Sequence, residues 1–262
     1  MPMKEYLSNI NLTDKLYALF KTDKCASELR KFDCANNDAI WHRLGFYKES
    51  TVILCENNIQ SEAKKLFESS RLNMTQTQIY WAIEELVRIH EHAHHLFFNL
   101  QWRNFKSNGA WPFKSQAATM LVKLGNLRGT NPNLKVHERF EGSESLRSIL
   151  GLSSPLQDKN YNGIYDKTII ESLPQFAVYY MIKRNEWLRM VFNQLDQNSP
   201  KEYRRWNDIF NSCKGYSVYD KITVVPYVFN VVTSVLLSPG LNPGVVPTNI
   251  TIDDVLDSLK HL

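Results

Sequence analysis

The segment spanning residues 76–102 constrains this chain most, because its apolar side chains recur with the period of an α-helix. The apolar positions are Ile79, Ala82, Ile83, Leu86, Ile89, Ala93 and Leu96. Their spacing is close to 3.6 residues, so one face of the helix is apolar along most of its length. Thr75 or Thr77 can cap its first turn. A helix of this kind has to bury its apolar face, so we expect it to run through the core.

The same segment reads IHEHAHHLFF over residues 89–98 and holds four of the seven histidines of the chain. His90 and His94 are four residues apart, so their imidazoles lie on one face of the helix. Two neutral imidazoles placed in this way can bind one zinc ion. Glu91 is turned by about 100° from His90, within reach of a water that zinc would bind and acidify. The segment therefore matches the H-E-x-x-H pattern of zinc hydrolases.

The two remaining histidines of the cluster have other expected roles. His92 points away from the pair, so we expect it on the surface or behind the ligands. For His95 we expect a place on the helix surface, with a hydrogen bond to the metal site as the alternative. The whole motif also has a simpler interpretation, a helix with exposed histidines that bind metal without catalysis. The apolar stripe continues on both sides of the motif, which favours a buried site.

A catalytic zinc site takes three protein ligands, so a third ligand is needed. Glu171 is the main candidate, because it lies near the start of an otherwise apolar helix, where an unpaired carboxylate is costly to bury. The alternative role of Glu171 is to favour the helix N-terminus through the helix dipole. Rival ligands lie in the segment VHERFEGSES, and they are His137, Glu138, Glu141 and Glu144.

The rest of the pattern predicts a mainly α protein with a small β component, an α+β fold. Helices are expected at residues 13–21, 25–32, 61–72, 166–195, 199–213 and 251–262, and a strand at residues 51–55. Residues 104–165 are broken by Gly and Pro and are expected to form loops with one or two short helices. We expect an N-terminal helical segment over residues 1–45, a catalytic domain over 46–212, and a C-terminal segment over 213–262 packed on that domain.

Composition excludes several classes of protein. Apolar residues make up 43% and charged residues 22%, which is typical of a globular protein. The net charge of +4 comes from scattered basic residues, so no nucleic acid is expected as a partner. The longest apolar segment, residues 222–237, is too short for a membrane span and contains Pro226 and Asn230.

The four cysteines are Cys25, Cys34, Cys55 and Cys213, and none forms a C-x-x-C pair. The first residues lack the apolar stretch of a signal peptide. We therefore expect reduced thiols in a cytoplasmic protein.

Four segments in this order, STVILCENNI, SEAKKLFESS, IHEHAHHLFF and ESLPQ, carry a resemblance to a known family. Over residues 46–210 the chain resembles the bacterial zincin-like, metallopeptidase-like proteins of the gluzincin type, most of them poorly characterised. The resemblance implies a zincin-like fold, in which the H-E-x-x-H helix packs against a second long helix and a short sheet. It also implies zinc, with His90, His94 and Glu171 as ligands and Glu91 as general base.

Two functions follow as hypotheses. The first is a zinc-dependent hydrolase, a metallopeptidase acting on peptides or proteins, in which Glu91 activates the zinc-bound water. Such an enzyme also needs an oxyanion donor, for which the candidates are Tyr179, Tyr161, Tyr165 and His137. The second is a non-catalytic interaction or regulatory protein on a zincin scaffold, such as a defence or stress component. Glu91 favours the enzyme, because a scaffold needs no carboxylate at that position.

Overall fold

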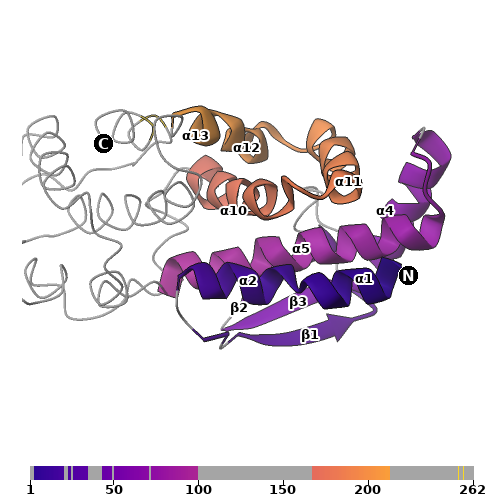
Figure 1. Ribbon diagram of the computed structural model, residues 1–262, viewed down its shortest axis with the longest axis horizontal. Coiled ribbons are helices and arrows are strands. Elements are labelled where there is room, and N and C mark those ends of the chain that lie inside the picture. Colours follow the sequence, from indigo (N-terminus) through magenta and orange to yellow (C-terminus); the bar gives the residue numbers. More distant parts are fainter. Residues whose placement is uncertain are drawn as a thin grey trace, which may run out of the picture. The chain divides into compact units, whose positions relative to one another are not determined.

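The described part of the chain is mainly helical and contains one small sheet, so the protein is an α+β protein (Figure 1). The computed structural model describes residues 3–20, 23–24, 26–34, 43–48, 50–70, 72–99, 167–212, 253 and 256. Contacts divide the chain into two compact units. The first consists of residues 1–96 and 171–206, and the second of residues 97–170 and 207–262. The predicted boundaries at residues 45 and 212 remain predictions.

Three strands form the sheet in the order β1-β3-β2. They are β1 (Ser27–Lys31), β2 (Gly45–Lys48) and β3 (Thr51–Cys55). β1 runs parallel to β3, whereas β2 runs antiparallel to it with Gly45 opposite Leu54. The predicted strand at residues 51–55 is confirmed, and its position at the centre of the sheet explains its run of buried apolar residues.

The helix predicted at residues 25–32 is wrong, because this segment forms β1. All five β1 residues are exposed, so no buried face marked the segment as a strand. Pairing with β3 decides its structure, and the partner strand lies more than twenty residues further along the chain. Strand formation that depends on a distant partner overrides local helical spacing.

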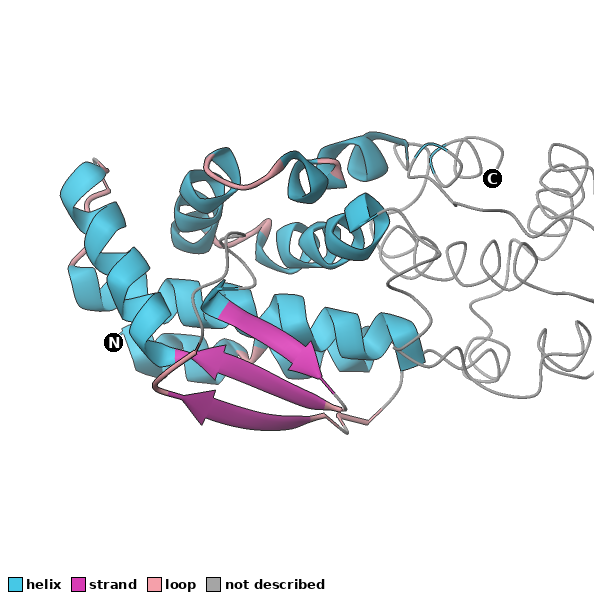
Figure 2. Cartoon of the chain, turned by 180° about the vertical axis from the view of Figure 1, so that it is seen from behind, coloured by secondary structure: helices cyan, strands magenta, loops and turns pink. Residues whose placement is uncertain are grey.

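The long helix α5 (Gln76–Asn99) confirms the helix expected from the apolar period. The expected apolar positions are buried, from Ile79 to Leu96. Thr75 Oγ1 accepts from the Gln78 amide while Gln78 Oε1 accepts from the Thr75 amide, which is a capping box. In both views α5 lies between the sheet and the later helices α10 (Lys167–Ile182) and α11 (Glu186–Gln197) (Figures 1 and 2).

Besides α5, α10 and α11, the described part of the chain contains five shorter helices. They are α1 (Met3–Ile10), α2 (Leu12–Leu19), α4 (Glu56–Ser69), α12 (Lys201–Arg204) and α13 (Trp206–Ser212). The helix expected at residues 13–21 corresponds to α2, and the one expected at 61–72 begins earlier, at Glu56. The single helix expected at 199–213 is divided into α12 and α13. Of the helix expected at 251–262, only residues 253 and 256 are described.

The single helix predicted at residues 166–195 is also wrong, because the structure divides it into α10 (Lys167–Ile182) and α11 (Glu186–Gln197). Asn185 is extended and its side chain accepts a hydrogen bond from the Leu188 amide at 3.0 Å. An Asn cap of this kind starts a new helix, so the chain turns between α10 and α11. Pro174 lies inside α10.

Cys34 and Cys55 form a disulfide, which corrects the expectation of reduced thiols for this pair, whereas Cys25 and Cys213 lie outside the described residues. Cys55 is buried at the end of β3, and Cys34 lies in the segment that follows β1. The two cysteines are 21 residues apart, so no C-x-x-C spacing marks the pair in the sequence. Disulfides persist mainly in oxidising compartments, so this bond gives no support to the expected cytoplasmic location, which stays a prediction. Among the described ranges, no helix has the length and apolar character needed to cross a bilayer.

Candidate metal centre

Three side chains from two helices converge in the core of the first compact unit. His90 and His94 come from α5 and Glu171 comes from α10, and all three are at least nine-tenths buried. The two Nε2 atoms are 3.1 Å apart. Glu171 Oε2 lies 3.4 Å from Nε2 of His90 and 3.6 Å from Nε2 of His94. Each residue thus offers one ligand atom to the same point.

These separations fit a single metal ion. Zinc binds nitrogen and oxygen ligands at about 2.0–2.1 Å in a tetrahedron, whose corners are then about 3.3 Å apart. The three distances between the ligand atoms, 3.1, 3.4 and 3.6 Å, scatter around that value. The group of two imidazoles and one carboxylate could therefore hold a metal ion.

The imidazole of His90 is oriented by a hydrogen bond from the opposite side of its ring. His90 Nδ1 lies 3.0 Å from Oε1 of Gln175, one turn beyond Glu171 on α10. An amide oxygen can only accept, so Nδ1 carries the proton and Nε2 keeps its lone pair for a metal. Burial, opposed by Glu171, lowers the pKa of His90 to about 4, so the ring is neutral at pH 7.

Glu91 is buried on the side of α5 that faces the sheet. Its side chain touches β2, since a Cβ placed on Gly45 would lie 3.5 Å from Glu91 Cγ. Burial, followed by the negative charge of Glu171, raises the pKa of Glu91 well above its usual range, and a hydrogen bond from the Tyr47 backbone opposes this. A carboxyl group of this kind holds a proton more readily than an exposed one.

Tyr203 lies against the same centre from α12. Its side chain is fully buried, and its ring stacks on His90 with the centroids 6.0 Å apart. Ser172 Oγ donates to the backbone carbonyl of Glu202 at 2.6 Å, which holds α12 against α10 next to Glu171. Burial, followed by the charge of Glu171, raises the pKa of Tyr203, so its phenol stays protonated at pH 7.

His92 is fully buried, which corrects the expectation of a surface position. His92 Nε2 lies 2.8 Å from Glu28 Oε1 on β1, and Nδ1 lies 3.0 Å from the hydroxyl of Tyr17 on α2. Glu28 is also paired with Arg88, at 3.3 Å. The first helices and β1 pack on this side of α5, and the period of α5 alone gives no sign of them.

His95 is buried as well, so its expected position on the helix surface is wrong. Its Nδ1 lies 3.1 Å from the hydroxyl of Tyr47 on β2. The backbone of Tyr47 also forms a hydrogen bond with Glu91, so Tyr47 contacts both His95 and Glu91. Its expected hydrogen bond to the metal site remains a prediction.

The other predicted site residues are not brought to the centre or are not described. Tyr179 stacks on Trp206, with centroids 4.4 Å apart, and belongs to an aromatic cluster with Phe192. His137, Glu138, Glu141, Glu144, Tyr161 and Tyr165 lie outside the described residues.

Sequence reasoning missed two residues at this centre, Gln175 and Tyr203. Gln175 could have been found, because it is four residues from Glu171 and therefore on the same face of its helix. Tyr203 carries no comparable signal, since α12 is a short helix whose position depends on contacts with α10.

Comparison with known proteins gives no independent assignment. No family model, curated protein or solved structure matches this chain. The resemblance to gluzincin-type proteins therefore remains a prediction.

Proposed function

We propose that this protein is a zinc-dependent hydrolase that cleaves peptides or proteins. One observation carries the proposal: His90, His94 and Glu171 converge at metal-ligand separations beside a second buried carboxylate, Glu91. The two carboxylates have different surroundings, since Glu171 faces the imidazoles and Glu91 faces β2. Such a difference allows one to bind metal and the other to transfer protons.

The donor atoms favour zinc among the divalent metals. Two imidazole nitrogens and one carboxylate oxygen are the protein ligands of several catalytic zinc sites, which keep a fourth position open. When bound, zinc supplies Lewis-acid polarisation of a carbonyl group and acidifies water. His90 contributes to this preference as a neutral ligand of fixed orientation, because Gln175 accepts a hydrogen bond from its Nδ1–H group.

Glu91 has the role of general base in this proposal. Burial raises the pKa of Glu91, which makes its carboxylate a stronger base towards a water molecule and suits a group that passes the proton on to the leaving amine. The phenol of Tyr203 is protonated and its ring stacks on the ligand His90, so it is a candidate donor to a developing oxyanion. Together these groups cover proton transfer and charge stabilisation in amide hydrolysis.

The alternative is an interaction protein in which the metal serves structure alone. Glu91 argues against it, because a carboxylate buried to 3% exposure costs stability and contributes nothing to a purely structural ion held by other side chains. The alternative becomes the better account if the metal-loaded protein cleaves no peptide bond.

The test compares the wild-type protein with Glu91→Gln, which keeps the shape of the side chain and removes its charge. Each is stripped with a chelator, reloaded with one equivalent of zinc, and assayed on fluorescein-labelled casein. Wild type should require zinc for cleavage, and Glu91→Gln should bind zinc normally but cleave on the order of 10²-fold more slowly. Equal cleavage by both proteins would show that Glu91 is not the general base.

A further inference from the structure

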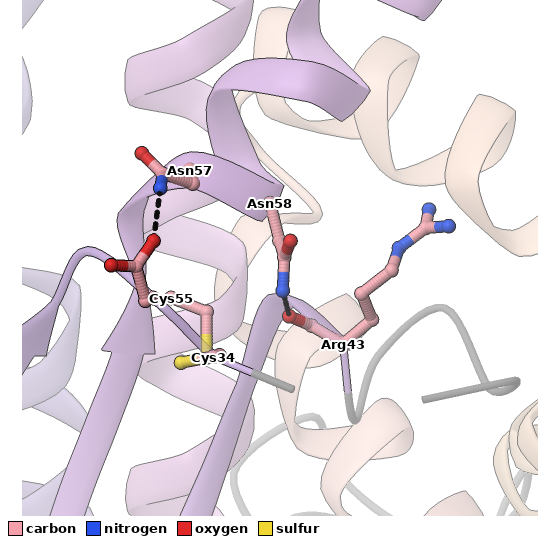
Figure 3. The surroundings of a disulfide bond; sticks show 6 residues. Cys34, Arg43, Cys55, Asn57 and Asn58 are labelled. Atoms are coloured by element: carbon pink, nitrogen blue, oxygen red, sulfur yellow. Dashed lines mark hydrogen bonds between the residues drawn. A yellow bond between two sulfur atoms is a disulfide. The ribbon is translucent and has the colours of Figure 1, made fainter. Parts of the chain in front are cut away.

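The Cys34–Cys55 disulfide joins a partly exposed residue to a buried one (Figure 3). Cys34 follows β1 and is partly exposed, whereas Cys55 ends β3 and is fully buried. Cys55 also directly precedes Glu56, the first residue of α4. Attack by an external thiol is therefore expected on the Cys34 side of the bond, and the N-terminus of α4 favours a thiolate on Cys55 as the leaving group.

Both described ends of the segment that joins β1 to β2 are attached to the start of α4 (Figure 3). At the first end the disulfide is accompanied by a hydrogen bond of 2.9 Å from Asn57 to Asp33. At the second end Asn58 donates to the backbone carbonyl of Arg43 at 2.7 Å. The disulfide is the covalent member of this set, so breaking it should weaken the attachment most.

The strand that follows this segment is the one that contacts Glu91. Cys55 follows Leu54, which is paired with Gly45 in the β2–β3 ladder. A Cβ on Gly45 would lie 2.5 Å from Val87 Cγ1 and 2.9 Å from the Ile53 carbonyl, so β2 fits closely between β3 and α5. A change at Cys55 therefore reaches the surroundings of Glu91 through adjacent, closely packed residues.

We propose that Cys34–Cys55 is a thiol–disulfide exchange site for a dithiol reductant, and that its reduction loosens β2 where it contacts Glu91. One thiolate of the reductant attacks Cys34 Sγ, the S–S bond breaks, and Cys55 leaves as a thiolate. The second thiolate of the reductant attacks the mixed disulfide and releases Cys34. The reductant is oxidised to its disulfide, and the cysteine pair takes up two electrons and two protons.

The first measurement follows the cysteines in the folded protein. The whole chain is treated with excess dithiothreitol without denaturant, labelled with iodoacetamide, and analysed by peptide mass spectrometry. Label should appear on Cys34, the partly exposed member of the pair, while the circular dichroism spectrum stays native. Label that appears only after the protein is unfolded would make the disulfide purely structural and overturn the proposal.

The second measurement follows hydrogen exchange of the Tyr47 amide, the β2 group that acts on Glu91. Reduction should speed its exchange by about 10-fold or more, while the amides of α11 exchange at unchanged rates. In Cys34→Ser the amide should exchange fast with or without dithiothreitol. Unchanged exchange on reduction of the wild-type protein would overturn the proposal, even if the variant failed to fold.

Asn57→Ala provides the matched control, because it removes the neighbouring hydrogen bond to Asp33 and leaves the disulfide intact. Its Tyr47 amide should stay protected until dithiothreitol is added. Fast exchange in oxidised Asn57→Ala would show that the disulfide has no special role in the attachment, and would contradict the proposal. These readouts use neither hydrolysis nor metal, so they succeed or fail independently of the proposed function.

Discussion

Helix α5 carries two histidine pairs, and their surroundings differ. His90 and His94 face each other and share one buried carboxylate, Glu171. His92 and His95 are equally buried, but their described partners include Tyr17 and Tyr47. Only the first pair therefore converges with a third ligand on one point.

The difference lies in how each ring uses its nitrogens. Burial lowers the pKa of His92, so the ring is neutral, and it can donate from Nε2 to Glu28 while Nδ1 accepts from the Tyr17 hydroxyl. Both nitrogens are then occupied by hydrogen bonds. His90 donates from Nδ1 to Gln175, and its Nε2 lies 3.1 Å from Nε2 of His94 and 3.4 Å from Oε2 of Glu171, the two other ligand atoms of the group. Residue type and helix are the same, and the packed neighbours decide the role.

The largest expected effect is a difference in zinc affinity between variants of Glu171, which lies beside the first pair, and of Glu28, which lies beside His92. Glu171→Ala should weaken zinc binding by more than the ~10–100-fold that loss of an outer hydrogen-bond partner costs, because two imidazoles alone make a poor site. Glu28→Ala should leave zinc affinity almost unchanged. Competition with a chromophoric chelator measures both. Equal losses of affinity in the two variants would erase the distinction between the pairs.

A smaller effect is expected at Gln175, which orients the metal-binding pair without contacting the metal. Gln175→Ala removes the acceptor of the His90 Nδ1 proton and should lower zinc affinity by about 10–100-fold. Tyr17→Phe is the matched change for the other pair, because it removes one hydrogen bond to His92 and should leave affinity intact. An unchanged affinity in Gln175→Ala would mean that packing alone orients His90.

The smallest expected effect concerns pH and the second pair. The hydrogen bond from His92, opposed by burial and aided by Arg88, lowers the pKa of Glu28 far below its usual value of 4.5. A carboxyl group with a lowered folded-state pKa contributes stability above the unfolded pKa and loses it as pH falls. The free energy of unfolding of the wild-type protein, measured by urea denaturation, should therefore decrease below about pH 4.5. In Glu28→Gln this decrease with falling pH should be smaller. A parallel decline in both would assign the acid sensitivity to other groups.

The sequence predicts the first pair far better than the second. The i, i+4 spacing of His90 and His94 is local to one helix, and Glu171 stands out as an acid in an apolar helix. The burial of His92 depends on α2 and β1, whose contacts Tyr17 and Glu28 lie more than sixty residues away. No periodicity within α5 reports such distant partners.

The same contrast between local and distant signals explains the fold. α5 and β3 have clear apolar patterns and were predicted at the right places. β1 is exposed and depends on its pairing with β3, so local spacing suggested a helix instead. The break between α10 and α11 depends on one capping residue, Asn185, inside an otherwise continuous helical pattern.

The most direct test of the account is anomalous diffraction from crystals of the zinc-loaded protein, collected at the zinc absorption edge. The account predicts one strong peak about 2.0–2.2 Å from Nε2 of His90, Nε2 of His94 and an oxygen of Glu171. A well-ordered centre without a peak, or a peak at His92 or His95 instead, would contradict it.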